Sequence, residues 1–335
     1  MQRRQFTVGT LATLSGLGGI MVSAHAQTPQ TPQTQWTPSR PLKLVVSAAP
    51  GSPPDVTARP LAEQLSASLG QPVVVENRPG AGGIVGMEAV LRSAPDGYTI
   101  GLASQSQMVF NPHLFDKLPY DPVRDVQPVI RTASVAIVLV AHPSLPADSL
   151  KDLMALSRTR PTPLHIGVAP LGQPPHVLGL LAQSEAGLKL EWLPFKGGVE
   201  AVAACRAGDI PLAVEAPSTV AQHVKAGALK ALAVTGTVRE PTLPDVPTVS
   251  EILGRRVPGE TWFGLVLPRG TPAEIVARLQ RDTAAALARP EIRAVYSRFG
   301  WRLIEGSSAE EFAATVRDEG PKWGEIIRKA GVKLG

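Results

Sequence analysis

The sequence is poor in the residues on which several functional classes depend. It has one cysteine, Cys205, so an intrachain disulfide is excluded. That cysteine lies on an apolar helical face, which is typical of a buried packing residue. Aromatic residues make up only 4% of the chain, and the basic residues form no clustered run. Nucleic-acid surfaces need concentrated positive charge and often stacking aromatics, so we expect no nucleic-acid partner.

Catalytic and metal-binding motifs are missing as well. Five histidines beyond the N-terminal region form neither an H-x-x-x-H nor an H-E-x-x-H pattern, and no G-x-S-x-G sequence is present. Gly80–Gly86 lacks the G-x-G-x-x-G spacing of a dinucleotide site. Asp121 and Asp125 flank Pro122, which is typical of a turn and a helix cap. We therefore predict no catalytic residue, no metal ion and no cofactor, and an exported enzyme ranks below a binding protein.

The N-terminus has the features of a signal peptide. Thr7–Val22 is apolar but shorter than the roughly 18 residues of a membrane span. Two arginines precede it, and an Ala-His-Ala cleavage site at 24–26 follows it, so the mature chain is predicted to begin at Gln27. The sequence Arg3–Phe6 favours the twin-arginine route slightly over general secretion. The residue directly after the cleavage site is Gln27 and not a cysteine, so we expect a periplasmic protein without a lipid anchor.

The remaining chain divides into a spacer and a large folded body. Residues 27–40 are rich in Thr, Pro and Gln and predict a disordered spacer. A body of about 300 residues is too large for one ordinary core, which predicts two lobes. Loss of residues 1–26 removes two arginines and no acids, leaving 31 basic and 28 acidic residues and a formal net charge of about +3.

Strand-like and helix-like segments alternate along this body. Val73–Val75 predicts a buried strand, a glycine-rich loop follows it, and a helix is expected from Ile84 until Ser93, before Pro95. The alternation predicts an α/β fold whose loops at strand ends can hold a ligand. Further strands are expected at 42–47, 98–100, 136–141, 164–168, 210–214 and 229–234. Further helices are expected at 56–69, 150–157, 176–186, 273–288 and 309–329, the last broken at Pro321.

Several segments together resemble a known family. Val-Glu-Asn-Arg-Pro-Gly-Ala-Gly-Gly at 75–83 is followed by Pro-Asp-Gly-Tyr-Thr at 95–99, Leu-Pro-Tyr-Asp-Pro at 118–122, Leu-Pro-Asp-Val-Pro-Thr at 243–248 and Trp-Phe-Gly-Leu at 262–265. The series covers nearly everything from Pro41 onward. It resembles the Bug family, the periplasmic substrate-binding proteins of tripartite tricarboxylate transporters. The resemblance implies a type II periplasmic binding protein, or Venus flytrap, with a ligand cleft between two α/β lobes. Lobe 1 would comprise 41–130 plus 240–335, and lobe 2 would comprise 131–239.

The first candidate ligand loop is 49–55. Asp55 is a candidate N-cap, and an anion at a helix N-terminus is stabilised by the dipole. The resemblance implies that this loop is one jaw of a carboxylate clamp, although a helix cap alone is the alternative. Family members usually have Gly-Gly where this chain has Gly51-Ser52. The two prolines that follow remove amide donors, so fewer amides or the Ser52 hydroxyl would hold the carboxylate.

The other candidates lie in the second half of the cleft. By resemblance, loop 169–175 is the opposite jaw. It has fewer hydroxyls than the family pattern, which indicates a ligand with an apolar or aromatic portion. His176 matches a family histidine, with packing or capping as the alternative. Phe195 replaces a frequent Tyr, and Glu215, which replaces a frequent Asp, either orients a ligand or closes the lobe. The predicted ligand-binding residues are Gly51, Ser52, Asp55, Gln105, Ala169, Leu171, Gly172, Gln173, His176, Phe195, Gly197 and Glu215.

The resulting prediction is an exported solute-binding protein that performs no chemistry. By resemblance it captures a small carboxylate, which is a dicarboxylate, an aromatic acid or an amino acid, for a tripartite tricarboxylate-type transporter. Its partners would be the ligand and the membrane permease subunits, and the chain itself would be a monomer. The alternative is a sensor whose closed form binds a signalling receptor. Fold and pocket would be the same in both.

Overall fold

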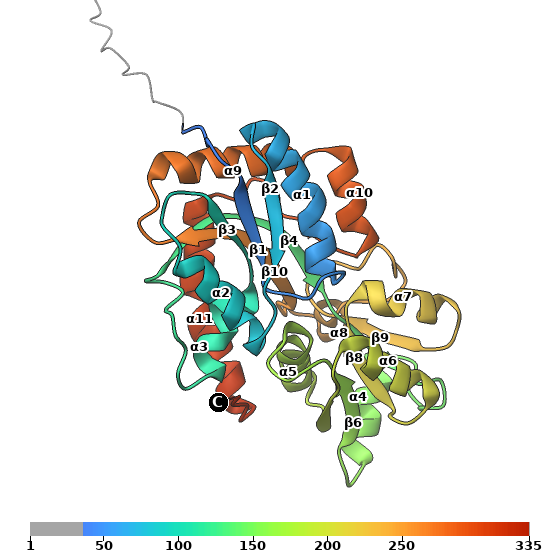
Figure 1. Ribbon diagram of the computed structural model, residues 1–335. Coiled ribbons are helices and arrows are strands. Elements are labelled where there is room, and N and C mark those ends of the chain that lie inside the picture. The colour runs from blue at the N-terminus through green and yellow to red at the C-terminus, as the bar shows by residue number, and fades with distance from the viewer. Residues whose placement is uncertain (1–35, 335) are drawn as a thin grey trace, which may run out of the picture. The chain divides into compact units, whose positions relative to one another are not determined.

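Two β-sheets organise the chain, as Figure 1 shows. The computed structural model describes residues 36–334, so the predicted signal peptide and most of the predicted spacer lie outside the described residues. The described residues form one compact unit. Among the described residues, no helix is both long enough and apolar enough to cross a bilayer.

The first sheet has six strands in the order β11-β4-β10-β3-β1-β2. Strand β1 pairs in parallel with β2 and β3, because helices carry the chain back between these strands. Strand β10 is antiparallel to both β3 and β4. The strands are β1 (Leu42–Val46), β2 (Val73–Asn77), β3 (Thr99–Ser104), β4 (Val126–Ala136), β10 (Glu260–Pro268) and β11 (Arg302–Leu303). The helices after β1, β2 and β3 are α1 (Pro53–Leu69), α2 (Ile84–Leu91) and α3 (Asn111–Leu114).

The second sheet has five strands in the order β7-β6-β8-β5-β9. Strand β6 pairs in parallel with β7 and β8, and β5 is antiparallel to β8 and β9. The strands are β5 (Val138–Ala141), β6 (Leu164–Val168), β7 (Leu190–Pro194), β8 (Leu212–Glu215) and β9 (Lys230–Val234). The helices that alternate with them are α4 (Leu150–Thr159), α5 (Pro174–Ala186), α6 (Gly198–Ala207) and α7 (Pro217–Lys225).

The chain passes between the sheets twice. Strand β4 ends at Ala136 and β5 begins at Val138, so Ile137 alone joins the two sheets on the outward passage. After β9 and the short helix α8 (Val249–Leu253), the chain returns to the first sheet as β10. The remaining helices are α9 (Ala273–Leu287), α10 (Pro290–Arg298) and α11 (Ala309–Lys329). The mixed α/β fold with two sheets agrees with the prediction, while the lobe boundaries remain a proposal.

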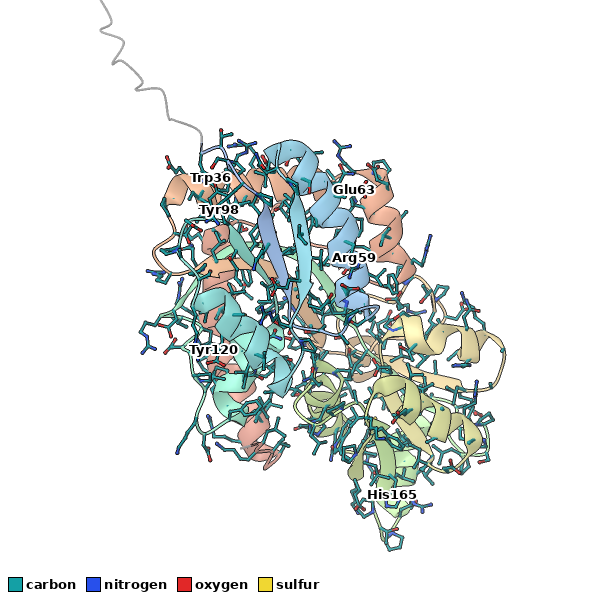
Figure 2. The ribbon with its side chains drawn as sticks, in the orientation of Figure 1. Trp36, Arg59, Glu63, Tyr98, Tyr120 and His165 are labelled. Carbon is teal, nitrogen blue, oxygen red and sulfur yellow. The ribbon has the colours of Figure 1, made fainter. Side chains whose placement is uncertain are left out.

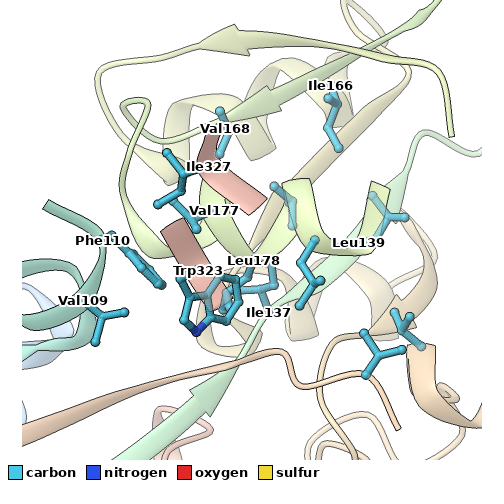
Figure 3. Close-up of a cluster of buried hydrophobic side chains, with 14 of the residues drawn as sticks. Val109, Phe110, Ile137, Leu139, Ile166, Val168, Val177, Leu178, Trp323 and Ile327 are labelled. Carbon is cyan, nitrogen blue, oxygen red and sulfur yellow. The ribbon is translucent and has the colours of Figure 1, made fainter. Parts of the chain in front are cut away.

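The C-terminal helix packs against both halves of the fold. Figure 3 shows Trp323 and Ile327 of α11 among Val177 and Leu178 of α5, in one cluster of buried apolar side chains. Trp323 also meets Phe110 edge-on, with 5.1 Å between ring centroids. Buried aromatic side chains contribute a large share of core stability, so α11 fixes α5 against the first half of the chain.

Several details differ from the sequence predictions, and four of them bear on the packing of the chain. Strand β2 lies at a sheet edge rather than in a buried position, and Val74 is 53% exposed. Helix α1 begins at Pro53 rather than at 56, because proline suits the first turn of a helix. Helix α11 continues through Pro321, whose exposed position leaves the freed carbonyl open to water. Residues 36–40, the end of the predicted spacer, contact the folded body: Figure 2 shows Trp36 beside Tyr98, with 5.9 Å between ring centroids.

Candidate ligand-binding site

A cavity of about 220 Å³ lies between residues of the two sheets. It is smaller than the roughly 300–1,000 Å³ that drug-sized ligands fill, so it suits a small metabolite. The first sheet and its connections supply residues of β1, β3, β4 and β10, the start of α1 and Trp301, and the second sheet's helices supply the starts of α5 and α7. The lining residues are Val46, Ser47, Ala48, Pro53, Pro54, Leu102, Ser104, Gln107, Val135, Ile137, Gln173, Pro174, Pro175, Glu215, Ala216, Thr261, Phe263 and Trp301.

Three helices begin at this cavity. The first residues of α1 and α5 line it, as does Ala216, the N-cap of α7. Each helix N-terminus carries a partial positive charge of roughly half an elementary charge, so the wall favours an anion. All three helices carry proline in their first turn. Since proline has no N–H, the cavity combines a favourable potential with few amide donors.

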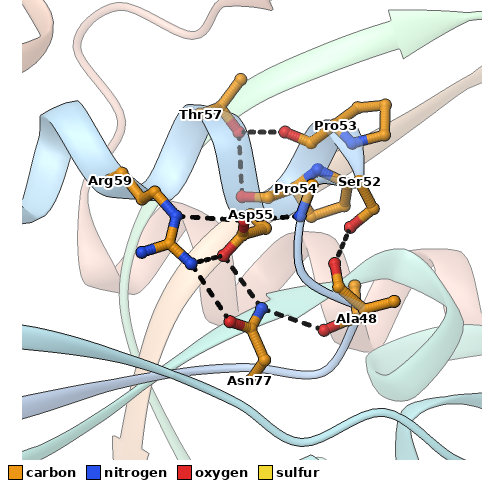
Figure 4. A network of polar contacts seen from close by, with 10 residues as sticks. Ala48, Ser52, Pro53, Pro54, Asp55, Thr57, Arg59 and Asn77 are labelled. Atoms are coloured by element: carbon orange, nitrogen blue, oxygen red, sulfur yellow. Dashed lines mark hydrogen bonds and ion pairs between the residues drawn. The ribbon is translucent and has the colours of Figure 1, made fainter.

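The loop before α1 is held by the Asp55 carboxylate (Figure 4). Asp55 is 2% exposed, and its carboxylate accepts hydrogen bonds from the Gly51 amide at 2.8 Å and from Asn77 Nδ2 at 2.9 Å. Arg59 Nη2 donates to it at 2.8 Å. Burial alone would raise the pKa of Asp55, but these hydrogen bonds outweigh it and lower the pKa below its usual value.

This geometry changes the interpretation of the first jaw. Ser52 is the N-cap of α1, so Asp55 lies inside the first turn and the prediction that it caps the helix is wrong. The Gly51 amide donates to Asp55, and the Ser52 amide donates to the Ala49 carbonyl at 3.2 Å. The cavity is lined by Pro53 and Pro54, but not by Gly51, Ser52 or Asp55. The loop therefore fixes the position of the wall and keeps its own amides occupied.

The second jaw is fixed by a buried histidine. The Gly172 amide donates to His176 Nδ1 at 3.1 Å, and the His176 ring meets Trp192 edge-on with 5.0 Å between centroids. Burial lowers the pKa of His176 to about 4, so the ring is neutral and able to accept at neutral pH. Of the predicted residues in this loop, Gln173 lines the cavity, and Ala169, Leu171, Gly172 and His176 do not.

Only one residue of the third predicted group lies at the cavity. Glu215 lines the cavity at the end of β8, whereas Phe195 and Gly197 do not. Phe195 packs against the cluster of buried residues around β5 and β8, and Gly197 is the N-cap of α6. Burial raises the pKa of Glu215, and only the hydrogen bond from the Ala216 amide opposes this effect.

Gln105 turns away from the cavity towards α11. Its Nε2 donates to Glu319 Oε2 at 2.7 Å, and Trp262 Nε1 donates to the same oxygen at 2.9 Å. Its neighbours Ser104 and Gln107 line the cavity instead. The Gln107 side-chain oxygen accepts from both the amide and the hydroxyl of Ser104 at 2.6 Å. A π-helical turn over Ser106–Phe110 follows β3, and such turns are common at functional sites.

One wall of the cavity is aromatic. The rings of Phe263 and Trp301 stack with 4.3 Å between centroids and an interplanar angle of 12°. Val135 and Ile137 extend this apolar surface. Among the described residues that line the cavity, none is a lysine or an arginine. An anion bound here would therefore be held by helix dipoles, hydroxyls and amides, with its carbon skeleton against the aromatic pair.

Comparisons with known proteins agree with this architecture. Residues 57–332 match the model of TctC, the tripartite tricarboxylate transporter family receptor. The chain belongs to this family. Protein BugT of Bordetella pertussis (strain Tohama I) is 34% identical to this TctC protein over 298 residues, which cover 89% of this chain and 91% of BugT. The resemblance to the Bug family is therefore confirmed.

Solved structures of similar proteins support the same assignment. R. palustris Rpa4515, solved with adipate, matches with a TM-score of 0.77 and 31% identity, covering 88% of this chain and 99% of that one. MatC from Rhodopseudomonas palustris, solved with bound malate, matches with a TM-score of 0.74 and 28% identity, covering 87% and 99%. TctC proteins are periplasmic solute-binding proteins and not enzymes. Among residues 36–334, no group of His, Cys, Asp and Glu side chains is arranged to hold a metal ion.

Proposed function

We propose that this TctC receptor captures a small carboxylate in the cavity described above and delivers it to the membrane subunits of a tripartite tricarboxylate transporter. The observation that carries the proposal is the convergence of three helix N-termini on one small cavity. Similar proteins solved with adipate and malate support a carboxylate as the ligand.

The proposal assigns the binding roles to residues that line the cavity. Gln173 and Glu215 come from the predicted set, and Ser104, Gln107 and Thr261 supply further polar groups. Hydrogen bonds of Gly51 with Asp55, and of Gly172 with His176, hold the loops that lead into the two proline pairs of the cavity wall, so these residues would act on the ligand indirectly. Lobe closure around the ligand would exclude water from the helix N-termini and strengthen the attraction of each dipole for the carboxylate.

The same proposal covers location and assembly. The predicted signal peptide would deliver the mature chain to the periplasm, with the twin-arginine route slightly favoured over general secretion, and the chain would act there as a monomer. Its two lobes would divide at Ile137 on the outward passage of the chain and between β9 and β10 on its return.

A thermal-shift screen with a cavity-filling variant tests the proposal. At 100 times its dissociation constant, a ligand should stabilise the protein by about 2.7 kcal/mol. Ala48→Trp places a large ring in the cavity wall, and Ala285→Trp on the exposed face of α9 is the matched control. We expect a small mono-, di- or amino-carboxylate to stabilise the native protein and the Ala285 variant, but not the Ala48 variant. Failure of every carboxylate on folded protein, or equal binding by all three proteins, would contradict the proposal.

A further inference from the structure

Two polar side chains flank the point where the chain passes between the sheets. Glu215 of β8 pairs with Val138 of β5, and Thr261 of β10 pairs with Val135 of β4. Ile137, the single residue between β4 and β5, lines the cavity together with both. Since paired residues on antiparallel strands lie about 4.5–5.5 Å apart, Glu215 and Thr261 reach the cavity from either side of Ile137. We call these three residues the crossing corner.

The polar groups of the crossing corner are incompletely paired. Thr261 is 3% exposed, and its Oγ1 has no hydrogen-bond partner among the described residues. Oε1 of Glu215 accepts from the Ala216 amide at 2.8 Å, and no described lysine or arginine forms an ion pair with the Glu215 carboxylate. Buried polar groups normally have hydrogen-bond partners. The Thr261 hydroxyl oxygen and the Glu215 carboxylate can therefore accept hydrogen bonds from a donor on a bound ligand.

The carboxylate of Glu215 lies close to the start of α6. A Cβ atom at Gly198 would lie 1.5 Å from Glu215 Oε2, so a side chain at that position would require the carboxylate to move. Glycine at position 198 therefore leaves room for the carboxylate in this orientation.

Charge decides which ligand suits such a site. Glu215 is the only acidic or basic residue among the described residues that line the cavity. A dicarboxylate would place two further negative charges beside it, without a cation to compensate them. A ligand with one carboxylate and one protonated nitrogen would carry its own compensating charge and would supply the missing donor. Burial raises the pKa of Glu215; a protonated nitrogen beside it would favour its ionised form, whereas a second ligand carboxylate would repel that form, which makes the second ligand the better match.

We propose that the crossing corner selects a small carboxylate that also carries a protonated nitrogen, with the nitrogen at Glu215 and Thr261 and the carboxylate at the starts of α1 and α5. The ligand class is thus an amino acid or a related zwitterion rather than a dicarboxylate. Phe263 and Trp301 contact the carbon skeleton between the two charged ends. This inference rests on the proposed function and names its substrate class.

Matched pairs of probes test the inference. Each pair has the same number of carbons and differs at one end only: 4-aminobutanoate and succinate, 6-aminohexanoate and adipate, 8-aminooctanoate and suberate. Dissociation constants are measured by calorimetry for the native protein, for Glu215→Gln and for Glu319→Gln. Glu319 is the matched control, because it is a partly buried carboxylate that does not line the cavity. Cooperative thermal unfolding of each variant shows that it is folded.

The outcomes separate the inference from the proposed function. We expect the native protein and Glu319→Gln to favour the amino acid of the best-fitting pair by about tenfold or more, and Glu215→Gln to lose that preference through weaker amino-acid binding and stronger dicarboxylate binding. Equal or tighter binding of the dicarboxylate by the native protein overturns the inference and leaves the proposed function standing, as does a preference that survives in Glu215→Gln. Absence of binding by every probe overturns the inference, and it contradicts the proposed function as well only when the wider carboxylate screen also fails.

Discussion

Replacing Asp55 by alanine should destabilise the loop that forms one wall of the cavity. The carboxylate accepts from the Gly51 amide and from Asn77 Nδ2, and both donors lose their acceptor in Asp55→Ala. An unsatisfied donor costs about 1–3 kcal/mol when buried, and about 1–1.5 kcal/mol is appropriate for these partly buried groups. The Arg59 side chain is 53% exposed, so water can replace its partner and its loss adds at most about 0.5 kcal/mol.

The expected loss is therefore about 2–3.5 kcal/mol in the free energy of unfolding. For about 300 folded residues the melting temperature should fall by about 3–6 °C. Urea unfolding followed by circular dichroism measures the loss, and Arg59→Ala is the control, with an expected effect of about 0.5 kcal/mol or less. Because the folded pKa of Asp55 is depressed, its contribution is present above the unfolded pKa and is lost as pH falls through the folded value.

Two results would refute this reasoning. A loss below about 0.5 kcal/mol in Asp55→Ala would show that water satisfies the Gly51 and Asn77 donors. Equal losses in Asp55→Ala and Arg59→Ala would show that the ion pair, rather than the two amide donors, carries the stabilisation. Ligand affinity should fall with stability in Asp55→Ala, because the same loop carries Pro53 and Pro54 into the cavity wall.

Two further predictions concern the opposite jaw and the aromatic wall. The folded pKa of His176 is about 4 and its ordinary value is 6.5, so the unfolded chain takes up the proton first on acidification. Stability should fall by about 3 kcal/mol between pH 6.5 and 4, and the slope should flatten in His176→Gln; an unchanged slope would contradict a buried neutral ring. Trp301 is 4% exposed and stacked on Phe263, so Trp301→Ala should cost about 3–5 kcal/mol in denaturant unfolding, and a loss under about 1 kcal/mol would contradict that packing.

Local sequence patterns were sufficient for much of the fold. The strand at 164–168 and the helix at 309–329 have the predicted bounds, because each consists of residues whose own spacing and caps define it. Helix α11, for example, begins with a capping box formed by Ser308 and Glu311. Strand β2 was harder to interpret, since a run of valines does not reveal whether neighbouring strands lie on both sides.

The candidate site was less accessible to sequence reasoning. The rule that ligands bind at loops after strands predicts Gln173 and Glu215 as site residues, and both line the cavity. The contributions of Thr261 and Trp301 depend on strand pairing between distant parts of the chain, and no local pattern encodes that pairing. Gln107 reaches the cavity because a π-helical turn follows β3, and the sequence around Ser104 does not predict that turn.

The cap at Asp55 shows a different limit. Two prolines before an acidic residue fit a loop that ends in a cap, and they equally fit the first turn of a helix. The structure has the second arrangement, with Ser52 at the N-cap position. The Asp55 carboxylate is instead bound by Asn77, which lies 22 residues away, and no local pattern predicts that contact.

A crystal structure of the protein with its best-binding small carboxylate tests the central claim most directly. We expect the ligand to occupy the cavity of about 220 Å³, with its carboxylate at the starts of α1 and α5 and its carbon skeleton against Phe263 and Trp301. A ligand bound elsewhere on the chain, or one whose carboxylate faces away from these helix N-termini, would contradict it.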